Sequence, residues 1–231
     1  MRIHKERSEG VLTLRLNRPD CLNAIDEAMA RALLDALHTA EQADDVRVIV
    51  IRGNGRAFCA GRDVTEPPTP QILALVQEVS LTIVRCAKPV VMAVHGWVVG
   101  AGAEWMLDAD IVLAARSTRF KLPEVGLGVF ATGGVTTLLP RFAGVARAKG
   151  LLLLGEEFSA EQAERWGLIW SLVDDDALEA EADRLADQLA GFDPEVVAGF
   201  KRVINKMGIG EFAAALEAEN RIHAQLGLHG E

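Results

Sequence analysis

The chain lacks several features that mark particular classes of protein. It contains no tyrosine, and aromatic residues make up only 5% of its 231 residues. No apolar run reaches the roughly 18 residues expected of a membrane-spanning helix. The first ten residues have no apolar core of the kind that a secretory signal carries. We therefore expect a cytoplasmic protein that does not enter a membrane.

Cysteine is also scarce, and its three occurrences, Cys21, Cys59 and Cys86, show no ligand spacing. An odd number of scattered cysteines fits a reducing compartment and no disulfide framework. No cluster of His, Cys and Asp has the spacing of a metal site, and neither G-x-G-x-x-G after a strand nor a phosphate-loop lysine motif occurs. The sequence therefore predicts no metal and no resident cofactor.

Basic residues are outnumbered, since 24 Lys and Arg against 33 Asp and Glu give a net charge of −9. Proteins that bind nucleic acids generally neutralise phosphates with an excess of Lys and Arg, so this balance argues against that class. A small anionic ligand stays compatible with the charge, because it needs only a local basic rim.

Hydrophobic residues make up 50% of the chain, enough for a substantial core. Short apolar runs bounded by turns predict strands at 10–16, 46–52, 90–94, 111–115, 119–122 and 169–173. Helical spacing and start signals predict helices at 23–43, 71–86, 103–107, 135–139, 146–154, 159–167, 177–189, 195–207 and 211–226, with a glycine-rich loop at 126–134.

Strands and helices alternate up to about residue 175, and helices alone follow. Alternation of this kind builds a parallel sheet with helices outside it. The sequence therefore predicts an α/β protein with a core and site in residues 1–175. Residues 176–231 form a separate helical layer in this prediction, and that layer is a candidate for self-association.

Two glutamates, Glu104 and Glu124, each follow a turn after a predicted strand. Ligand sites of parallel sheets lie at the carboxyl ends of strands, so we expect the two side chains in one cleft. Two carboxylates there can divide acid and base work if their environments separate their pKa values. Spacing alone leaves open that both are ordinary glutamates at helix starts or on the surface.

Two turns of small residues, Gly100-Ala101-Gly102 and Ala60-Gly61-Arg62, also follow predicted strands. A backbone N–H from each turn can hold a carbonyl oxygen as it becomes an oxyanion. The simpler interpretation is that the glycines only permit tight turns. Of the remaining candidates, we interpret His95 and Cys59 as core residues, whereas Trp97 and Phe130 either line an apolar pocket or belong to the core.

Five segments, taken together and in order, resemble the crotonase (enoyl-CoA hydratase/isomerase) superfamily. They are residues 16–25, 46–64, 88–115, 120–128 and 139–173. The resemblance implies a spiral of ββα units with a C-terminal helical region that builds trimers or hexamers. It also implies an acyl-CoA thioester as substrate.

The resemblance assigns roles to individual residues. Glu104 and Glu124 match catalytic glutamates of hydratases, and Arg62 and Ala101 match the oxyanion-hole donors. Substrate-binding and CoA-binding positions fall on Leu22, Ala24, Ala60, Asp63, Val64, Trp97, Gly100, Pro123 and Phe130. Residues 131–135 depart from the usual Pro-Gly-x-Gly-Gly, and Arg62 stands where a small residue is usual.

The reaction expected from this resemblance is reversible hydration of a 2-enoyl-CoA. The alternative is a Δ3–Δ2-enoyl-CoA isomerase or another reaction on the same oxyanion hole, such as thioester hydrolysis. An isomerase can move a proton with one carboxylate and does not need Glu104. A non-catalytic module that binds CoA or RNA is a third possibility, and the acidic balance argues against its RNA form.

Overall fold

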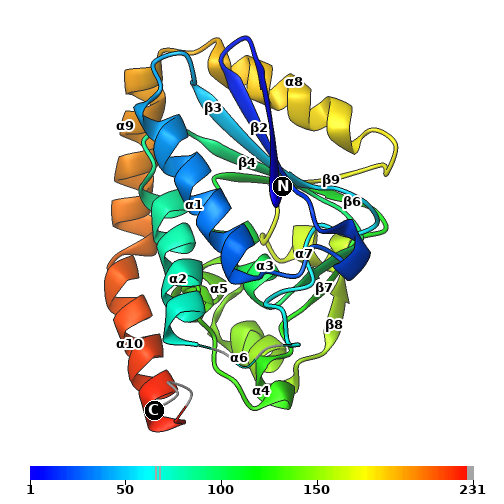
Figure 1. Cartoon of the computed structure of the whole chain (residues 1–231), viewed down its shortest axis with the longest axis vertical. Helices are drawn as coiled ribbons and strands as arrows, with labels where there is room; N and C mark the ends of the chain where they lie inside the picture. The colour runs from blue at the N-terminus through cyan, green and yellow to red at the C-terminus, as the bar shows by residue number, and fades with distance from the viewer. Residues whose placement is uncertain (66, 68, 228–231) are drawn as a thin grey trace.

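The computed structural model describes residues 1–65, 67 and 69–227, and it contains two sheets (Figure 1). The main sheet has six strands in the order β1 (Ile3–Ser8), β2 (Val11–Leu16), β3 (Val48–Gly53), β4 (Val90–Val94), β6 (Ile111–Ala115) and β9 (Ser171–Val173). Only β1 runs antiparallel to its neighbour. A small sheet contains β5 (Trp97–Val99), β7 (Arg119–Lys121) and β8 (Glu157–Ser159).

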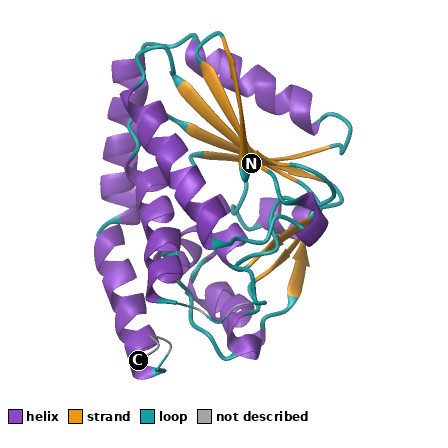
Figure 2. Cartoon of the chain, viewed as in Figure 1, coloured by secondary structure: helices purple, strands orange, loops and turns teal. Residues whose placement is uncertain are grey.

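Helices surround both sheets (Figure 2). They are α1 (Glu27–Gln42), α2 (Pro70–Arg85), α3 (Ala101–Asp108), α4 (Glu124–Leu127), α5 (Val135–Ala143), α6 (Val145–Leu154), α7 (Ala160–Arg165), α8 (Leu178–Ala190), α9 (Pro194–Ile204) and α10 (Phe212–Gln225). A 3-10 turn at Pro19–Cys21 and a π-helical turn at Asn205–Ile209 complete the regular structure.

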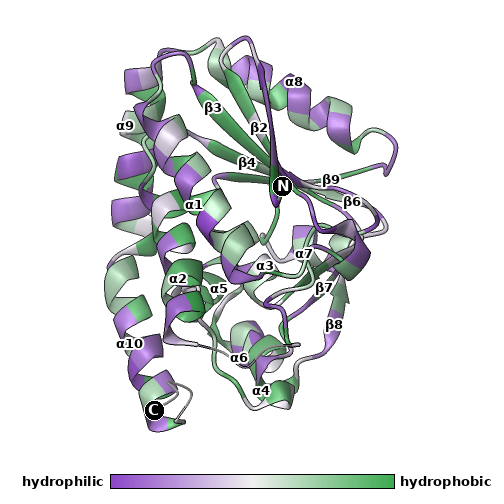
Figure 3. Ribbon diagram, in the orientation of Figure 1, coloured by the Kyte–Doolittle hydropathy of each residue, from purple (hydrophilic) through white to green (hydrophobic). Residues whose placement is uncertain are grey.

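The main sheet is covered on both faces, which explains why its central strands β3 and β4 are mostly apolar (Figure 3). On β3, Ile49 and Ile51 belong to the large core that includes α1 and α2. Val48 and Val50 point the other way, against Ala186 and Ala190 of α8. The period of two along the strand thus divides its side chains between the two layers of helices.

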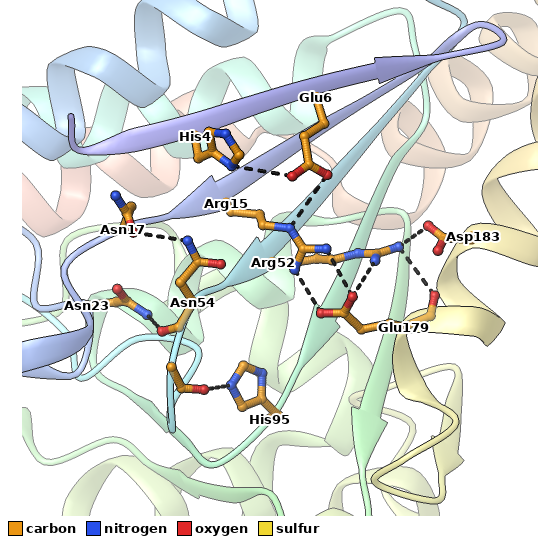
Figure 4. A network of polar contacts seen from close by, with 11 residues as sticks. His4, Glu6, Arg15, Asn17, Asn23, Arg52, Asn54, His95, Glu179 and Asp183 are labelled. Carbon is orange, nitrogen blue, oxygen red and sulfur yellow. Dashed lines mark hydrogen bonds and ion pairs between the residues drawn. The ribbon is translucent and has the colours of Figure 1, made fainter.

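A buried arginine fastens α8 to the sheet. Arg52 on β3 is only 3% exposed and forms ion pairs with Glu179 and Asp183 of α8. The Arg15 guanidinium on β2 donates two hydrogen bonds to the Glu179 carboxylate, at 2.7 and 2.9 Å (Figure 4). The charge of Arg52 is tolerated inside the strand because its carboxylate partners belong to α8, on the face of the sheet opposite to α1 and α2.

Most of the predicted strands and helices are confirmed within a few residues. The strands at 90–94 and 111–115 are exact, and Ser159 with Gln162 forms both hydrogen bonds of a capping box. The start at Asp193 is confirmed too, because its carboxylate caps α9. The fold prediction is also confirmed: β4–β5–α3 and β6–β7–α4 are successive ββα units, followed by a helical C-terminal region.

Other predictions were wrong in ways that matter for the site. Strand β5 was not predicted, and the predicted loop at 126–134 begins inside α4. β1 and β8 were not predicted. The C-terminal helices were expected as a separate layer, but α8 lies directly on the main sheet. β5 and β8 have three residues each, which is too few to show a period of two, and β1 is polar and exposed after its first residue.

Candidate active site

The small sheet, not the main one, brings the two glutamates together. β5 and β7 are parallel neighbours, so the turns that follow them lie side by side. Glu104 lies in the first turn of α3, directly after β5, and Glu124 begins α4 after β7. The Gly100 N–H donates to the Lys121 carbonyl at 3.0 Å and ties the two turns to each other. The expectation that both glutamates follow edges of the main sheet is therefore corrected.

Glycine is required at position 100 because Glu124 lies against it. Gly100 has φ of 50°, and a Cβ there would lie 3.1 Å from Oε1 of Glu124. Glycine is required at position 61 on the opposite turn for the same reason. Gly61 has φ of 87°, and a Cβ there would lie only 2.9 Å from the Val99 carbonyl oxygen. The small residues therefore let two turns and a carboxylate approach one another.

These elements enclose a cavity of about 600 Å³. Nine of the residues assigned from the resemblance line it: Ala60, Arg62, Val64, Gly100, Ala101, Glu104, Pro123, Glu124 and Phe130. Leu73 and Val76 of α2 and Val129 add an apolar wall. The volume and the mostly apolar lining with a few convergent polar groups are typical of a small-molecule site.

Glu104 is 1% exposed and is held by a loop. Its Oε2 accepts a hydrogen bond of 2.6 Å from the Gly133 N–H, and the Thr132 N–H lies 3.1 Å from Oε1. Burial, together with the charges of Glu124 and Glu219, raises the pKa of Glu104 well above its usual value. The two backbone donors act in the opposite direction, because they favour the ionised carboxylate.

Glu124 is half-buried, and its Oε2 finds no hydrogen-bond partner in the described part of the chain. Burial raises the pKa of Glu124 to about 7. Two carboxyl groups that interact in one cleft titrate as a pair and do not ionise together readily. Near neutral pH the site can therefore hold one proton between them, which is the state that acid–base catalysis requires.

Backbone groups of two neighbouring turns, 60–62 and the start of α3, also line the cavity. Ala101 is the first residue of α3, where helical N–H groups have no partner within the helix. A Cβ on Gly61 would lie 3.7 Å from the Ala101 nitrogen, so the 60–62 turn and the start of α3 are in close contact. Arg62 and Ala101 therefore line the same cavity from neighbouring turns.

Four of the assigned residues lie outside the cavity lining. Leu22 and Ala24 adjoin the 60–63 segment: the Ala60 N–H donates to the Leu22 carbonyl at 2.9 Å. Asp63 pairs with Arg18 at 2.9 Å, and hydrogen bonds from Thr65 and Arg18 lower the pKa of Asp63 to about 2. Trp97 occupies the first position of β5, away from the cavity.

His95 is only partly buried, so its interpretation as a core residue was wrong, whereas Cys59 lies in the core. The His95 ring nitrogen Nε2 lies 2.8 Å from the Gly55 carbonyl oxygen, beside the network around Arg52 (Figure 4). Cys59 is buried, its Sγ lies 3.2 Å from the Asn23 carbonyl oxygen, and burial raises the pKa of the thiol to about 12. Such a thiol carries almost no thiolate at neutral pH, so the interpretation of Cys59 as a core residue is confirmed.

Two residues of α10 near the site were not predicted. His223 lines the cavity, and Glu219 is 1% exposed and electrostatically coupled to Glu104. Both share the inward face of α10 with Phe212 and Leu216. A charged residue and a histidine on the apolar stripe of a helix are the signal that could have identified them. Among the described residues, no three His, Cys, Asp or Glu side chains are placed to hold a metal ion.

Comparison with known proteins places this geometry in context. A family model described as enoyl-CoA hydratase/isomerase matches residues 6–230. The chain is 44% identical over 192 residues to a 1,2-epoxyphenylacetyl-CoA isomerase of Escherichia coli, covering 79% of this chain and 73% of that protein. It is 37% identical over 231 residues to a probable enoyl-CoA hydratase of Rhodobacter capsulatus, covering 97% and 89%. A crystal structure of an enoyl-CoA hydratase from Mycobacterium avium subsp. paratuberculosis superposes with a TM-score of 0.93 at 30% identity, covering 97% and 93%.

Proposed function

Because the chain belongs to the enoyl-CoA hydratase/isomerase family, we propose that it adds water reversibly to the double bond of a 2-enoyl-CoA. The observation that carries this proposal is the pair of glutamates in one cavity, one with backbone donors on both oxygens and one with a buried oxygen that has no partner. That difference supplies a base and an acid to the same substrate.

The thioester carbonyl is held by the backbone N–H groups of Arg62 and Ala101. Negative charge develops on that oxygen when water adds to C3, because the electrons of the C2–C3 double bond move toward the carbonyl. Donors aimed at a developing oxyanion contribute about 3–4 kcal/mol each to transition-state stabilisation. The enolate that results is the species that this part of the site stabilises.

We assign the pair's single proton to Glu124 in the resting state. Burial and the neighbouring carboxylates raise the pKa of Glu104, but its two backbone donors favour the carboxylate form, whereas Oε2 of Glu124 has no such donor in the described part of the chain. In the proposed step Glu104 reacts in that carboxylate form and takes a proton from water as the oxygen bonds to C3. Glu124 then gives its proton to C2, so the product is a 3-hydroxyacyl-CoA. The pair ends with its proton on Glu104, and exchange with solvent restores the starting state.

The CoA part of the substrate lies along Leu22, Ala24 and the Ala60–Val64 segment, outside the cavity mouth. Arg62 provides positive charge there, whereas Arg18 is in ion pairs with Asp26 and Asp63. The acyl chain extends toward Leu73, Val76 and Phe130. No resident cofactor takes part in this scheme.

An isomerase is the second candidate, supported by the 44% identity to a 1,2-epoxyphenylacetyl-CoA isomerase. Proton transfer by Glu124 and the oxyanion hole would be sufficient for that chemistry. Thioester hydrolysis on the same oxyanion hole is a further alternative. The burial and hydrogen bonding of Glu104 favour hydration, because isomerisation by one carboxylate gives that residue no role.

The deciding experiment follows the loss of enoyl absorbance of crotonyl-CoA with Glu104→Gln and Glu124→Gln tested separately. Hydration predicts that each variant loses at least about 100-fold in turnover, since base and acid are both needed. A Glu104→Gln variant with normal turnover would exclude the hydratase mechanism. Conversion of a 3-enoyl-CoA by that variant would instead support the isomerase.

We also infer that copies of this chain associate as a trimer or a hexamer. Five apolar side chains of α9 and the following π-helical turn are more than half exposed: Val196, Phe200, Val203, Ile204 and Met207. An exposed stripe of that size is typical of a surface covered by a partner.

The three cysteines are free, which supports the proposal that the protein resides in the cytoplasm. No helix of the described part of the chain is long and apolar enough to cross a membrane.

A further inference from the structure

Residues 131–136, called the 131–136 loop below, comprise a loop and the first two residues of α5, and two buried acids hold them at once. The N–H groups of Thr132 and Gly133 donate to Glu104. The next donors along the same loop, the N–H groups of Gly134 and Thr136, point to Glu219 of α10 at 3.0 and 3.3 Å. The Thr136 hydroxyl adds a third hydrogen bond to Glu219, at 2.5 Å.

Burial of Glu219 at this position has a large free-energy cost. It is 1% exposed, and burying a carboxylate is strongly unfavourable unless hydrogen bonds compensate for the lost water. Its three donors are two backbone groups and a hydroxyl of the loop and the first turn of α5. Glu219 therefore fixes the part of the chain that immediately follows the donors to Glu104.

His223, one turn further along α10, fastens the other side of the loop. Its Nε2 lies 3.0 Å from the Ala131 carbonyl oxygen, and Phe130 meets the imidazole ring edge-on. α10 thus holds the loop at Ala131 and again at Gly134 and Thr136. The two residues that donate to Glu104 lie between these points.

We propose that Glu219 is a positioning residue for Glu104, acting through the backbone of the 131–136 loop. This inference deepens the proposed hydratase function and rests on it. If the loop moved, Glu104 would lose the two N–H donors that favour its carboxylate form and fix its orientation. Glu124 and the oxyanion-hole residues belong to other segments, namely α4, α3 and the 60–62 turn.

The test compares two activities of the same protein. Hydration of crotonyl-CoA needs Glu104, whereas exchange of the C2 hydrogens of butyryl-CoA in D2O needs only Glu124 and the oxyanion hole. We expect Glu219→Gln to lower kcat for hydration on the order of 10–100-fold, because its amide group puts a donor against one of the loop N–H groups. KM and the C2 exchange rate, followed by NMR, should stay within about threefold of the original.

Two further variants sharpen the result. Glu217→Gln makes the same change on the exposed side of α10 and should leave both activities unaltered. Thr136→Val removes one donor to Glu219 without touching Glu104, and it should lower hydration by about threefold while sparing exchange.

Three outcomes would overturn the inference. Full hydration in Glu219→Gln, or an equal loss of hydration and exchange, would show that Glu219 does not act through Glu104. If the unsubstituted protein exchanges C2 hydrogens but does not hydrate crotonyl-CoA, the proposed function itself is overturned, and the inference with it. The exchange reaction keeps these failures distinguishable.

Discussion

The Gly133 N–H lies 2.6 Å from Oε2 of Glu104, and a side chain at position 133 has no room beside this bond. A Cβ there would lie 2.8 Å from that oxygen and 2.7 Å from the Ser80 hydroxyl. Contacts this short force the neighbours to move. The glycine is therefore required by the contact with Glu104 and not merely by a turn.

Gly133→Ala should consequently lower hydration kcat at least about tenfold and destabilise the fold by about 1–3 kcal/mol. Turnover of crotonyl-CoA and thermal unfolding measure the two effects. Gly150→Ala is the matched control, because that helical glycine has no atom within 4 Å of an added Cβ. It should leave activity unchanged and raise stability slightly. Normal turnover in Gly133→Ala would contradict this view of the loop.

The rate of hydration should fall as the pH rises through about 7. Burial raises the pKa of Glu124 to about 7, and the proposed mechanism requires its protonated form. Above that pH the proton is lost, so kcat/KM should decline toward a tenfold loss for each further pH unit. A pH profile from 5 to 9 tests this, with Glu124→Gln expected to lack the decline. A rate that rises between pH 7 and 9 would reverse the assignment of acid and base.

Asp108 should make the protein less stable at higher pH. It lies one turn after Glu104 on α3, is 4% exposed, and neither carboxylate oxygen has a hydrogen-bond partner among the described residues. Burial raises the pKa of Asp108 well above 3.8. The folded state therefore binds this proton more tightly than the unfolded state does. Between the two pKa values, stability falls with rising pH by up to about 1.4 kcal/mol per unit.

Asp108→Asn removes that titration and should be the more stable protein at pH 8, with a smaller difference at pH 5. Denaturant unfolding at both values measures the change in free energy. Asp187→Asn, on the exposed side of α8, is the control and should show no such pH dependence. A difference that shrinks from pH 5 to pH 8 would have the wrong sign.

Association through α9 predicts a change of mass when its apolar stripe is made acidic. The original protein should behave as a trimer or hexamer in light scattering, and Phe200→Glu with Ile204→Glu should yield monomers, because buried carboxylates without partners are costly. Ala180→Glu, an exposed position on α8, should leave the assembly intact. A monomeric original protein would refute the proposal.

Local sequence determined the elements whose signals are contained within one segment. The strand at 90–94 is apolar along its length because both faces of the main sheet are covered, and that run is visible without any structure. Two helix starts could be predicted because their capping hydrogen bonds join residues two or three positions apart. They are the capping box of Ser159 with Gln162 and the cap at Asp193. Glu104 was correctly placed at the opening of a helix because a glycine-rich turn precedes it.

Only the tertiary structure decided how Glu104 is held. β5 and β7 are three residues each, and nothing within either strand indicates that they pair and carry the two glutamates to one cavity. Glu219 and His223 reach the 131–136 loop from the last helix, across contacts of more than 80 positions along the chain. Local patterns record preferences of neighbouring residues, whereas burial of a carboxylate and the donors that satisfy it depend on segments that meet only after folding.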